Sequence, residues 1–482
     1  MNLYIDSHTF HYEMENLLRA FFVYDKINVI KEYDQLHSPY VLTSFTDCIS
    51  VSVQIDDFSK TLKAPKFFDD EKDELCMAQL MYDILCEYHG TTLPWGILTG
   101  VRPIKLLRRF IDKMGASDAT KYFADEFKVS KEKLELALIT QKAERDILDL
   151  SQRDSFSLYI SIPFCPSRCN YCSFVSQSIE KAKHLIDDYV DLLCKELVYT
   201  AQIAKKLSLR LESVYMGGGT PTTLSAQQMD RVLSVVNTHF DMSNCREFTV
   251  EAGRPDTITR EKLLAIKKNN VDRISINPQT LNDTVLSIIG RRHSAQDAID
   301  AFMLARECGF DNINMDLIAG LQGDNYDSFV DTLDKVRELS PESITIHTLS
   351  LKRSSNLNTD KVDIDIGIKN ETTKMLEYSQ NVLICDEYIP YYLYRQSRMA
   401  GNLENVGWSK KGCESLYNVF VMDETHTILA CGAGAVTKLK DYDSDKLVRI
   451  FNFKFPYEYN TRFDELIDRK DEIEEFYNTY FV

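Results

Sequence analysis

The chain has 482 residues, is 44% hydrophobic and carries a formal net charge of −17, so it can hold two or three domains of about 100–200 residues. The acidic balance argues against nucleic acid as a partner, because a phosphate backbone repels negative charge. No stretch approaches the roughly 20 apolar residues that span a bilayer, and no basic start with an apolar core marks a secretory signal. We therefore expect a cytoplasmic protein without a membrane span.

Residues 1–152 are predicted to form an N-terminal α+β domain. The first 65 residues contain strand-like runs such as LYIDS and ISVSVQI, and residues 70–150 carry apolar residues at helical spacing. Between two helical stretches stands a basic cluster: Arg102, Lys105, Arg108 and Arg109. This cluster fits either a solvated helix face or an anion contact for carboxylates or a nucleotide, and both interpretations stay open at this point.

From residue 153 to residue 386, short β-rich runs alternate with helical segments, which is the pattern of βαβ units around a parallel sheet. The six predicted strands are Leu158–Ile162, Ser213–Met216, Phe248–Glu251, Arg273–Asn277, Ile313–Ile318 and Ser343–His347. Because such crossovers are right-handed, six units curl into part of a barrel. We therefore predict an α/β fold with a partial (β/α)6 barrel, followed by a small C-terminal domain over residues 387–482.

Three of the twelve cysteines lie within eight residues, in SIPFCPSRCNYCSF directly after the first predicted strand. Cys165, Cys169 and Cys172 have the spacing C-x3-C-x2-C. Three such thiolates can bind three irons of a [4Fe–4S] cluster and leave the fourth iron open to a small molecule, whereas electron-transfer ferredoxin sites use four cysteines. Zinc is the competing interpretation, but structural zinc usually takes a fourth cysteine or a histidine, and no histidine lies in this loop.

Each later strand ends in residues that could serve the same site, because the carboxyl ends of parallel strands meet at one mouth of a barrel. GGGTP (217–221) follows the second strand, and consecutive glycines let the backbone approach a ligand closely. Polar residues follow the other strands or a nearby helix start: Glu251, Gln279, Arg291, Arg292, Asp316 and His347. Any one of the strand-end residues fits a cap equally well, but their recurrence at strand ends favours one shared site.

Together these motifs resemble the oxygen-independent coproporphyrinogen III oxidase group of radical S-adenosylmethionine (SAM) proteins. The resemblance rests on IPFC-x3-C-x2-C, GGGTP, the Glu and Gln after the third and fourth strands, NMDLI-x-GL and the late GAGA. GILTGVRPIKLL in the N-terminal region is similar to the coproporphyrinogen dehydrogenase branch of the group. The resemblance implies that the three cysteines hold a [4Fe–4S] cluster and that SAM chelates its open iron. It also implies SAM contacts for Tyr159, Gly217, Gly218, Gly219, Thr220, Glu251, Gln279, Arg291 and Asp316.

The implied activity is the oxidative decarboxylation of coproporphyrinogen III to protoporphyrinogen IX in haem biosynthesis. SAM cleavage would supply a 5′-deoxyadenosyl radical, and a flavodoxin or a ferredoxin would supply the electron. Because the porphyrinogen substrate carries several carboxylates, arginine or lysine is expected near the mouth. The alternatives are a haem-binding carrier of the same fold, or another radical SAM reaction on a tetrapyrrole, such as ring opening or methyl transfer.

Two positions depart from the pattern of the group. Phe174 stands where the best-studied members have a fourth cysteine, and Ser161 stands where they have a histidine before IPFC. Members that lack the fourth cysteine include haem-handling proteins that are not oxidases, so the motifs specify the superfamily more closely than the substrate. Phe174 is expected either to shield the cluster from water or to pack in the barrel core.

Overall fold

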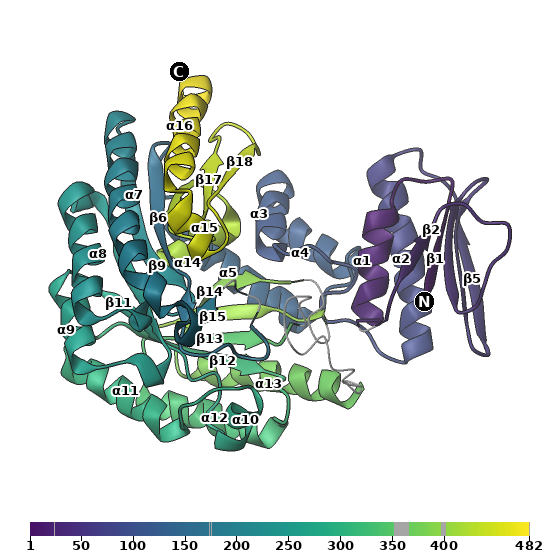
Figure 1. The fold of residues 1–482 in the computed structure, drawn as a ribbon. Helices are drawn as coiled ribbons and strands as arrows, with labels where there is room; N and C mark the ends of the chain where they lie inside the picture. Colours follow the sequence, from purple (N-terminus) through teal and green to yellow (C-terminus); the bar gives the residue numbers. More distant parts are fainter. Residues whose placement is uncertain (24, 173, 175, 351–365, 397–401, 482) are drawn as a thin grey trace.

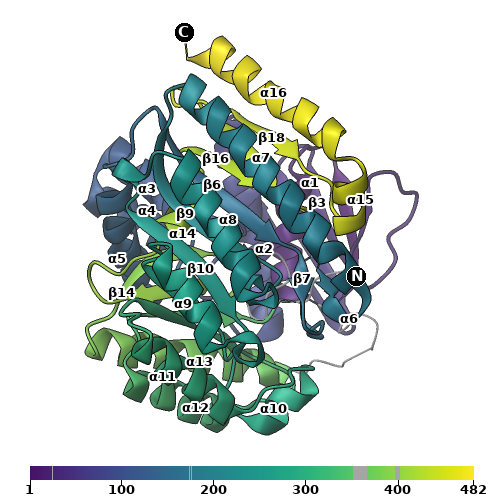
Figure 2. The ribbon, with the colours of Figure 1, turned by 60° about the vertical axis from the view of Figure 1, so that its left-hand side comes forward.

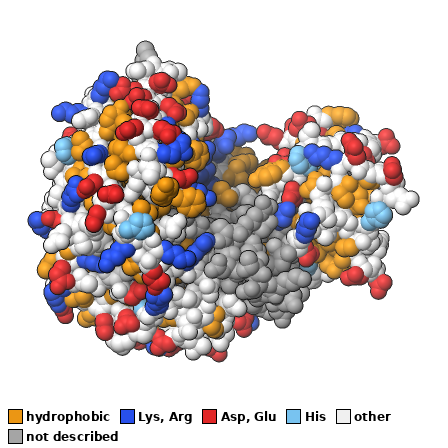
Figure 3. Space-filling view, in the orientation of Figure 1, with side chains coloured by type: hydrophobic (Ala, Val, Ile, Leu, Met, Phe, Trp, Pro, Cys, Tyr) orange, Lys and Arg blue, Asp and Glu red, His pale blue; other side chains and the backbone are white. Residues whose placement is uncertain are grey.

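A computed structural model describes residues 1–23, 25–172, 174, 176–350, 366–396 and 402–481. The chain forms a large α/β body and a smaller N-terminal lobe (Figure 1). Acidic and basic side chains are interspersed over the face that Figure 3 shows, so neither charge gathers into one field there. In the part of the chain that the structure describes, no helix is long and apolar enough to cross a membrane.

The N-terminal lobe is a five-stranded sheet in the order β2–β1–β3–β4–β5, with helices packed on one face. In β4 every second residue is buried, because one face of the strand packs against α2. The elements are β1 (Asn2–Asp6), α1 (His11–Phe21), β2 (Asn28–Ile30), β3 (Tyr40–Phe45), β4 (Ile49–Ile55), β5 (Phe58–Ala64) and α2 (Asp70–His89).

Three helices connect this lobe to the barrel: α3 (Pro103–Met114), α4 (Ala116–Asp125) and α5 (Lys131–Leu148). Helix α3 begins at Pro103, a position where the missing N–H of proline costs no intrahelical hydrogen bond. Ser130 caps α5 by accepting a hydrogen bond from the N–H of Lys133.

The barrel strands belong to an eleven-stranded sheet in the order β14–β15–β13–β12–β11–β10–β9–β6–β16–β17–β18. Its central strands run parallel to one another, and they confirm the predicted partial (β/α)6 barrel. These strands are β6 (Ser155–Ile162), β9 (Arg210–Gly218), β10 (Glu247–Gly253), β11 (Arg273–Ile276), β12 (Ile313–Ala319) and β13 (Ser343–Thr348).

Helices cover the outer face of the barrel strands (Figure 2). Ser225 and Ser294 form capping boxes at the starts of α8 and α11, which mark where two of these helices begin. The helices are α7 (Ile186–Lys206), α8 (Ala226–His239), α9 (Arg260–Lys268), α10 (Asp283–Ile288), α11 (Ala295–Glu307), α12 (Tyr326–Leu339) and α13 (Ile366–Cys385).

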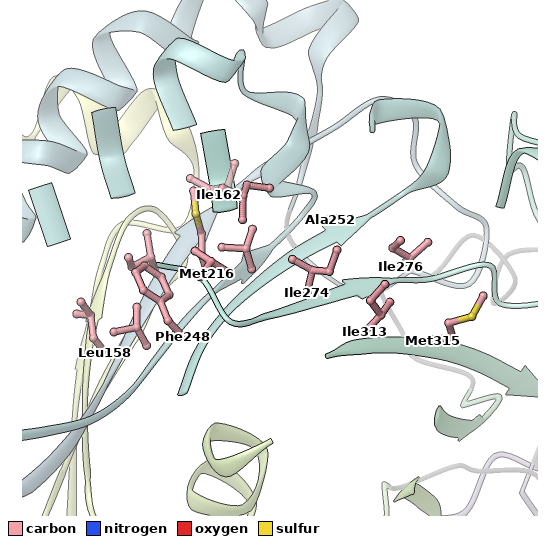
Figure 4. Close-up of a cluster of buried hydrophobic side chains, with 14 of the residues drawn as sticks. Leu158, Ile162, Met216, Phe248, Ala252, Ile274, Ile276, Ile313 and Met315 are labelled. Carbon is pink, nitrogen blue, oxygen red and sulfur yellow. The ribbon is translucent and has the colours of Figure 1, made fainter. Parts of the chain in front are cut away.

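Side chains along the parallel strands alternate between the helix layer and the barrel interior. Ile274 and Ile276 of β11 point into the apolar layer, together with buried side chains of the neighbouring strands (Figure 4). The alternate residues of the same strand, Arg273 and Ser275, line an internal cavity of about 450 Å³. Apolar packing therefore lies outside the barrel, and polar side chains collect inside it.

Residues 387–482 extend the barrel sheet at both edges. Two strands continue it beyond β13 in antiparallel pairing, and β16 lies parallel to β6 at the other edge, followed by β17 and β18. The long C-terminal helix α16 packs along α7 (Figure 2). These residues share a sheet with the barrel, and the domain boundaries at residues 152 and 386 stay predictions. The elements are β14 (Ile389–Tyr394), β15 (Asn405–Ser409), α14 (Leu416–Asp423), β16 (Thr427–Cys431), β17 (Val436–Lys440), β18 (Leu447–Phe451), α15 (Pro456–Thr461) and α16 (Phe463–Tyr480).

The basic cluster on α3 binds the acidic end of α14. Arg102 pairs with Glu424 at 2.8 Å, Arg108 pairs with Asp423, and Lys105 donates to the Asp423 carbonyl at 2.8 Å. Three of the four cations therefore fix α3 to α14, two of them through carboxylates of the protein itself.

Candidate active site

The three clustered cysteines lie at the mouth of the barrel, in the loop that follows β6. Cys165 ends the short strand β7 (Phe164–Cys165), which pairs with β8 (Gln177–Ser178). The N–H of Cys172 donates to the carbonyl of Cys169 at 3.1 Å, and all three cysteines line the cavity. Burial raises the pKa of the Cys165 and Cys172 thiols, so a positive charge such as a metal is needed to hold them as thiolates.

The glycine motif after β9 packs directly against this loop. The N–H groups of Gly219 and Thr220 donate to the carbonyls of Ile162 and Phe164, both at 2.8 Å. The Thr220 hydroxyl lies 3.6 Å from the sulfur of Cys165. A Cβ atom on Gly219 would stand 2.6 Å from the Phe164 carbonyl oxygen and 2.9 Å from that sulfur. Glycine is required here because no side chain fits between the motif and the cysteine loop.

Glu251 of β10 faces the cavity beside stacked tyrosine rings. It accepts a hydrogen bond from the Tyr215 hydroxyl at 2.5 Å. The rings of Tyr159, Tyr215 and Tyr417 are nearly parallel, with centroids separated by 6.4, 5.8 and 4.5 Å. Burial raises the pKa of Glu251 to about 7, and the charge of Asp316 adds to the shift. The Glu251 carboxyl group is therefore partly protonated near neutral pH.

Gln279 has a strained backbone and an unpaired side-chain oxygen. Its φ of +70° lies in the left-handed region, which costs a non-glycine residue about 1–2 kcal/mol. Hydrogen bonds hold it there, because its N–H donates to the Asp316 carbonyl at 2.9 Å and its carbonyl accepts from Ile318 at 3.0 Å. Among the described residues, its buried Oε1 atom finds no hydrogen-bond partner. Such an acceptor beside a cavity suits a ligand that donates a hydrogen bond.

Asp316 supplies a charged acceptor beside Gln279. Its carboxylate accepts from the Asn314 amide at 2.7 Å and lies 3.8 Å from His347 Nε2. Burial opposes its ionisation, but the neighbouring His347 and the hydrogen bond from Asn314 hold the pKa of Asp316 below its ordinary value. Two carboxyl groups of the same cavity, Asp316 and Glu251, thus have pKa values shifted in opposite directions.

Of the two adjoining arginines, Arg291 faces the cavity and Arg292 does not. Arg291 donates to the Asn277 carbonyl at 2.8 Å and to the Tyr171 hydroxyl at 3.0 Å, so it ties the end of β11 to the cysteine loop. Arg292 is exposed and pairs with Glu180 at 2.9 Å.

Arg254 is a buried cation beside the cysteines that the sequence motifs did not lead us to expect. Arg254 is 4% exposed and donates to both carboxylate oxygens of Asp256, at 2.9 and 2.8 Å. Its other amino group donates to the Ser167 hydroxyl at 2.8 Å and lies 4.0 Å from the sulfur of Cys169. Its place in VEAGRP, directly after a strand end, was the signal that could have indicated it.

Comparisons with known proteins agree with this geometry. The family model of the radical SAM superfamily matches residues 159–336. The oxygen-independent coproporphyrinogen-III oxidase-like protein HemZ of Bacillus subtilis is 38% identical over 417 residues, which are 86% of this chain and 83% of that protein. The chain belongs to the oxygen-independent coproporphyrinogen III oxidase group of the radical SAM superfamily.

Two further similarities are informative. The heme chaperone HemW of Bacillus subtilis is 37% identical over 194 residues, covering 40% of this chain and 50% of that protein. Coproporphyrinogen III oxidase (HemN) from Escherichia coli, a radical SAM enzyme of known structure, superposes with a TM-score of 0.53 at 21% identity, over 67% of this chain and 72% of that one. The structural likeness shows the shared fold.

As a radical SAM protein, the chain uses a [4Fe–4S] cluster and SAM as cofactors, and the residues present fit both groups. Three thiols come from one loop, and the Gln279 oxygen and the Arg291 Nε atom are buried without a hydrogen-bond partner among the described residues. A Cβ atom on Gly217 would stand 3.0 Å from the Glu251 carboxyl carbon, so only a bare backbone passes there. The three thiols that would bind the cluster and the unpaired polar atoms that could contact SAM thus line the same cavity.

Ser161, which stands in place of the family's histidine, is buried beneath the cysteine loop. Its hydroxyl donates to the Ala433 carbonyl at 2.8 Å, and its own carbonyl accepts from the Tyr189 hydroxyl at 2.7 Å. A Cβ atom on Gly432 would stand 2.5 Å from the same Ser161 carbonyl oxygen. The late GAGA motif therefore serves as the surface against which the end of β6 packs.

Phe174, which stands in place of the family's fourth cysteine, is 64% exposed and lines the cavity. The expectation that it packs in the barrel core is therefore wrong, because a core side chain has no such exposure. The shielding hypothesis stays a prediction.

Replacing Phe174 by Asp is expected to slow SAM cleavage several-fold, because water near a cluster changes its potential. The melting temperature should stay nearly constant, since surface substitutions usually change stability by about 0.5 kcal/mol or less. Phe174→Cys is the matched control and should leave iron content and cleavage nearly unchanged. The measurement is the rate of 5′-deoxyadenosine formation with dithionite, and cleavage at the native rate in Phe174→Asp would contradict shielding.

Proposed function

We propose that this protein is an oxygen-independent coproporphyrinogen III oxidase, which converts coproporphyrinogen III to protoporphyrinogen IX. The observation that carries the proposal is a single cavity of about 450 Å³ that runs from the three cysteines into a tyrosine-lined barrel interior. The cavity joins the cofactor positions to the tyrosine-lined interior. The arginines expected for a carboxylate-rich substrate also line it: Arg168, Arg254, Arg273 and Arg291.

In this proposal, Cys165, Cys169 and Cys172 hold the [4Fe–4S] cluster, and the backbone of residues 217–220 passes beside SAM. The remaining SAM contacts are Tyr159, Glu251, Gln279, Arg291 and Asp316. Together, the two cofactors supply the one-electron chemistry that removes a hydrogen atom from the substrate. The protein contributes binding and orientation, which for cofactor enzymes are the parts that the polypeptide controls.

The cavity residues divide this work according to their contacts. Gln279 Oε1 can accept a hydrogen bond from bound SAM, and the charged Asp316 offers a second acceptor beside it. Arg291 keeps the cysteine loop at the end of β11 through Tyr171. The stacked tyrosine rings line part of the interior with apolar area, which disfavours water there.

Each reacting propionate would lose one hydrogen atom, one CO2 and one electron, and a vinyl group would remain. Two such events account for the product, and a one-electron acceptor must take up the electron each time. Radical SAM enzymes also need a reductant, for which we propose a flavodoxin or a ferredoxin, and we place the reaction in the cytoplasm.

A haem-binding carrier is the second candidate function. It is favoured by the similarity to the heme chaperone HemW over 194 residues, and by Phe174 at the position of the fourth cysteine. A carrier would use the same cavity to bind haem and would leave the tetrapyrrole unchanged.

Anaerobic incubation with SAM, dithionite and coproporphyrinogen III should yield protoporphyrinogen IX and 5′-deoxyadenosine. Both products are measured by chromatography, and a Cys169→Ala variant provides the control without a cluster. Haem binding with neither product would contradict the oxidase and support the carrier. Consumption of haem in a parallel incubation would indicate ring opening instead.

A further inference from the structure

Arg273, the first residue of β11, is a buried cation with few partners. It is 1% exposed and lines the cavity. A guanidinium group has five N–H donors and stays charged at physiological pH. In the described part of the chain, Arg273 donates one hydrogen bond, to the Ser343 hydroxyl at 3.0 Å, and its Nε atom has no partner. It forms no ion pair with a carboxylate that the structure describes.

The other buried arginines of the cavity are better satisfied. Arg254 makes a two-pronged contact with Asp256, and Arg291 donates to Tyr171 and to a backbone carbonyl. Burying a charge without a partner is costly, and native proteins usually pair such groups. Glu247 is near enough for its charge to favour the charged form of Arg273, but most N–H donors of Arg273 still lack an acceptor among the described residues.

The nearby carboxylate of Glu247 is already engaged elsewhere. One of its oxygens accepts from the hydroxyls of Thr249 and Ser415, at 2.6 and 3.0 Å. The other accepts from the N–H groups of Leu416 and Tyr417 at the start of α14. Glu247 thus caps this helix, and neither oxygen is left to pair with Arg273.

The sheet register places Arg273 below the cofactor residues. Glu251 pairs with Ser275, and Thr249 pairs with Arg273, two residues closer to the start of the parallel strands. Two residues along a strand span about 7 Å. A ligand side chain inside the cavity can therefore lie within reach of the guanidinium group.

We propose that Arg273 binds a carboxylate of the substrate at a subsite in the floor of the cavity. A carboxylate can accept two parallel N–H bonds from a guanidinium group, and such a pair would satisfy donors that lack partners in the protein. This inference rests on the proposed function, whose substrate carries propionate side chains. The subsite would select ring systems with a carboxylate arm long enough to pass Glu251.

The test compares the intact wild-type protein with Arg273→Met and uses coproporphyrin III, the unreactive oxidised macrocycle, as the probe. The dissociation constant should rise about ten- to a hundredfold in the variant, because a hydrogen bond to a charged group is lost. The melting temperature should stay close to that of wild type, since Arg273 donates one hydrogen bond within the described part of the protein. Arg273→Lys, which retains the charge, should restore part of the affinity.

If Arg273 only stabilises the fold, both the melting temperature and the affinity for coproporphyrin III should respond differently. Arg273→Met would then melt lower and bind coproporphyrin III within about twofold of wild type, and the subsite would be overturned. Arg337→Met is the matched control, because Arg337 pairs with Asp334 on α12 and with Asp386 directly after α13, and does not line the cavity. It should leave the affinity for coproporphyrin III unchanged.

Failure of the proposed function is distinguishable from failure of the subsite. If wild type neither binds coproporphyrin III nor converts the porphyrinogen, the function fails, and sodium propionate becomes the probe of Arg273. Propionate should then raise the melting temperature of wild type more than that of Arg273→Met, with sodium chloride as the ionic-strength control. Equal shifts in both proteins would overturn the subsite as well.

Discussion

Replacing Cys165, Cys169 or Cys172 by Ala is expected to abolish the iron–sulfur cluster and all SAM cleavage. All three line one cavity, and their loop supplies one thiolate for each of three irons. With one ligand removed, two irons would lack a protein ligand, and a cubane held by two thiolates is not retained. Reconstituted wild type should bind about four irons per chain, the content of one [4Fe–4S] cluster, and each variant should bind close to none.

Cys308→Ala and Cys385→Ala are the controls for this result. Cys308 is buried at the end of α11, and Cys385 is exposed at the end of α13. Both should leave iron and sulfide content unchanged. Anaerobically prepared wild type that contains stoichiometric zinc and no iron would contradict the cluster assignment.

Gln279→Ala and Asp316→Ala should each weaken SAM binding about ten- to a hundredfold. The physical reason is the loss of a hydrogen bond to a charged ligand, which is worth roughly 1.5–3 kcal/mol. The unpaired Oε1 atom of Gln279 supports this expectation, because an acceptor without a partner adds nothing to the stability of the ligand-free protein. Equilibrium binding of SAM to cluster-loaded protein measures the effect.

Iron content must stay intact in both variants for this comparison, since a lost cluster would also lower SAM affinity. Gln296→Ala on α11 is a matched control, because Gln296 is exposed and bonds only Asp300 among the described residues. Unchanged SAM affinity in both cavity variants would show that Gln279 and Asp316 are strand-end caps.

The parallel strands and the residues at their carboxyl ends could be predicted from the sequence, because both leave local signals. Ile274 and Ile276 alternate with Arg273 and Ser275, and the polar motifs follow the strands directly. The pairing of β16 with β6 left no such signal. Local periodicity indicates that a segment is a strand, whereas its neighbour depends on packing across the whole chain.

In the candidate site, too, contacts between residues far apart in the sequence could not be predicted from local patterns. Tyr417 joins the tyrosine stack because Glu247, at the start of a distant strand, caps the helix that carries it. Neither residue stands in a motif, so only the folded structure brings them together. The exposure of Phe174 was equally hidden, because an aromatic residue after a cysteine motif suits a core or a surface.

The pairing of β16 with β6 also determines how late in synthesis the barrel sheet can be completed. Ser157 of β6 and His426, which precedes β16, are 269 residues apart and share a hydrogen bond of 2.8 Å. A ribosome that adds 5–20 residues per second needs roughly 13–54 s to make the intervening segment. The three cysteines therefore emerge long before the sheet around them can close. Until then the end of β6 lacks the packing of residues 432–433 against Ser161.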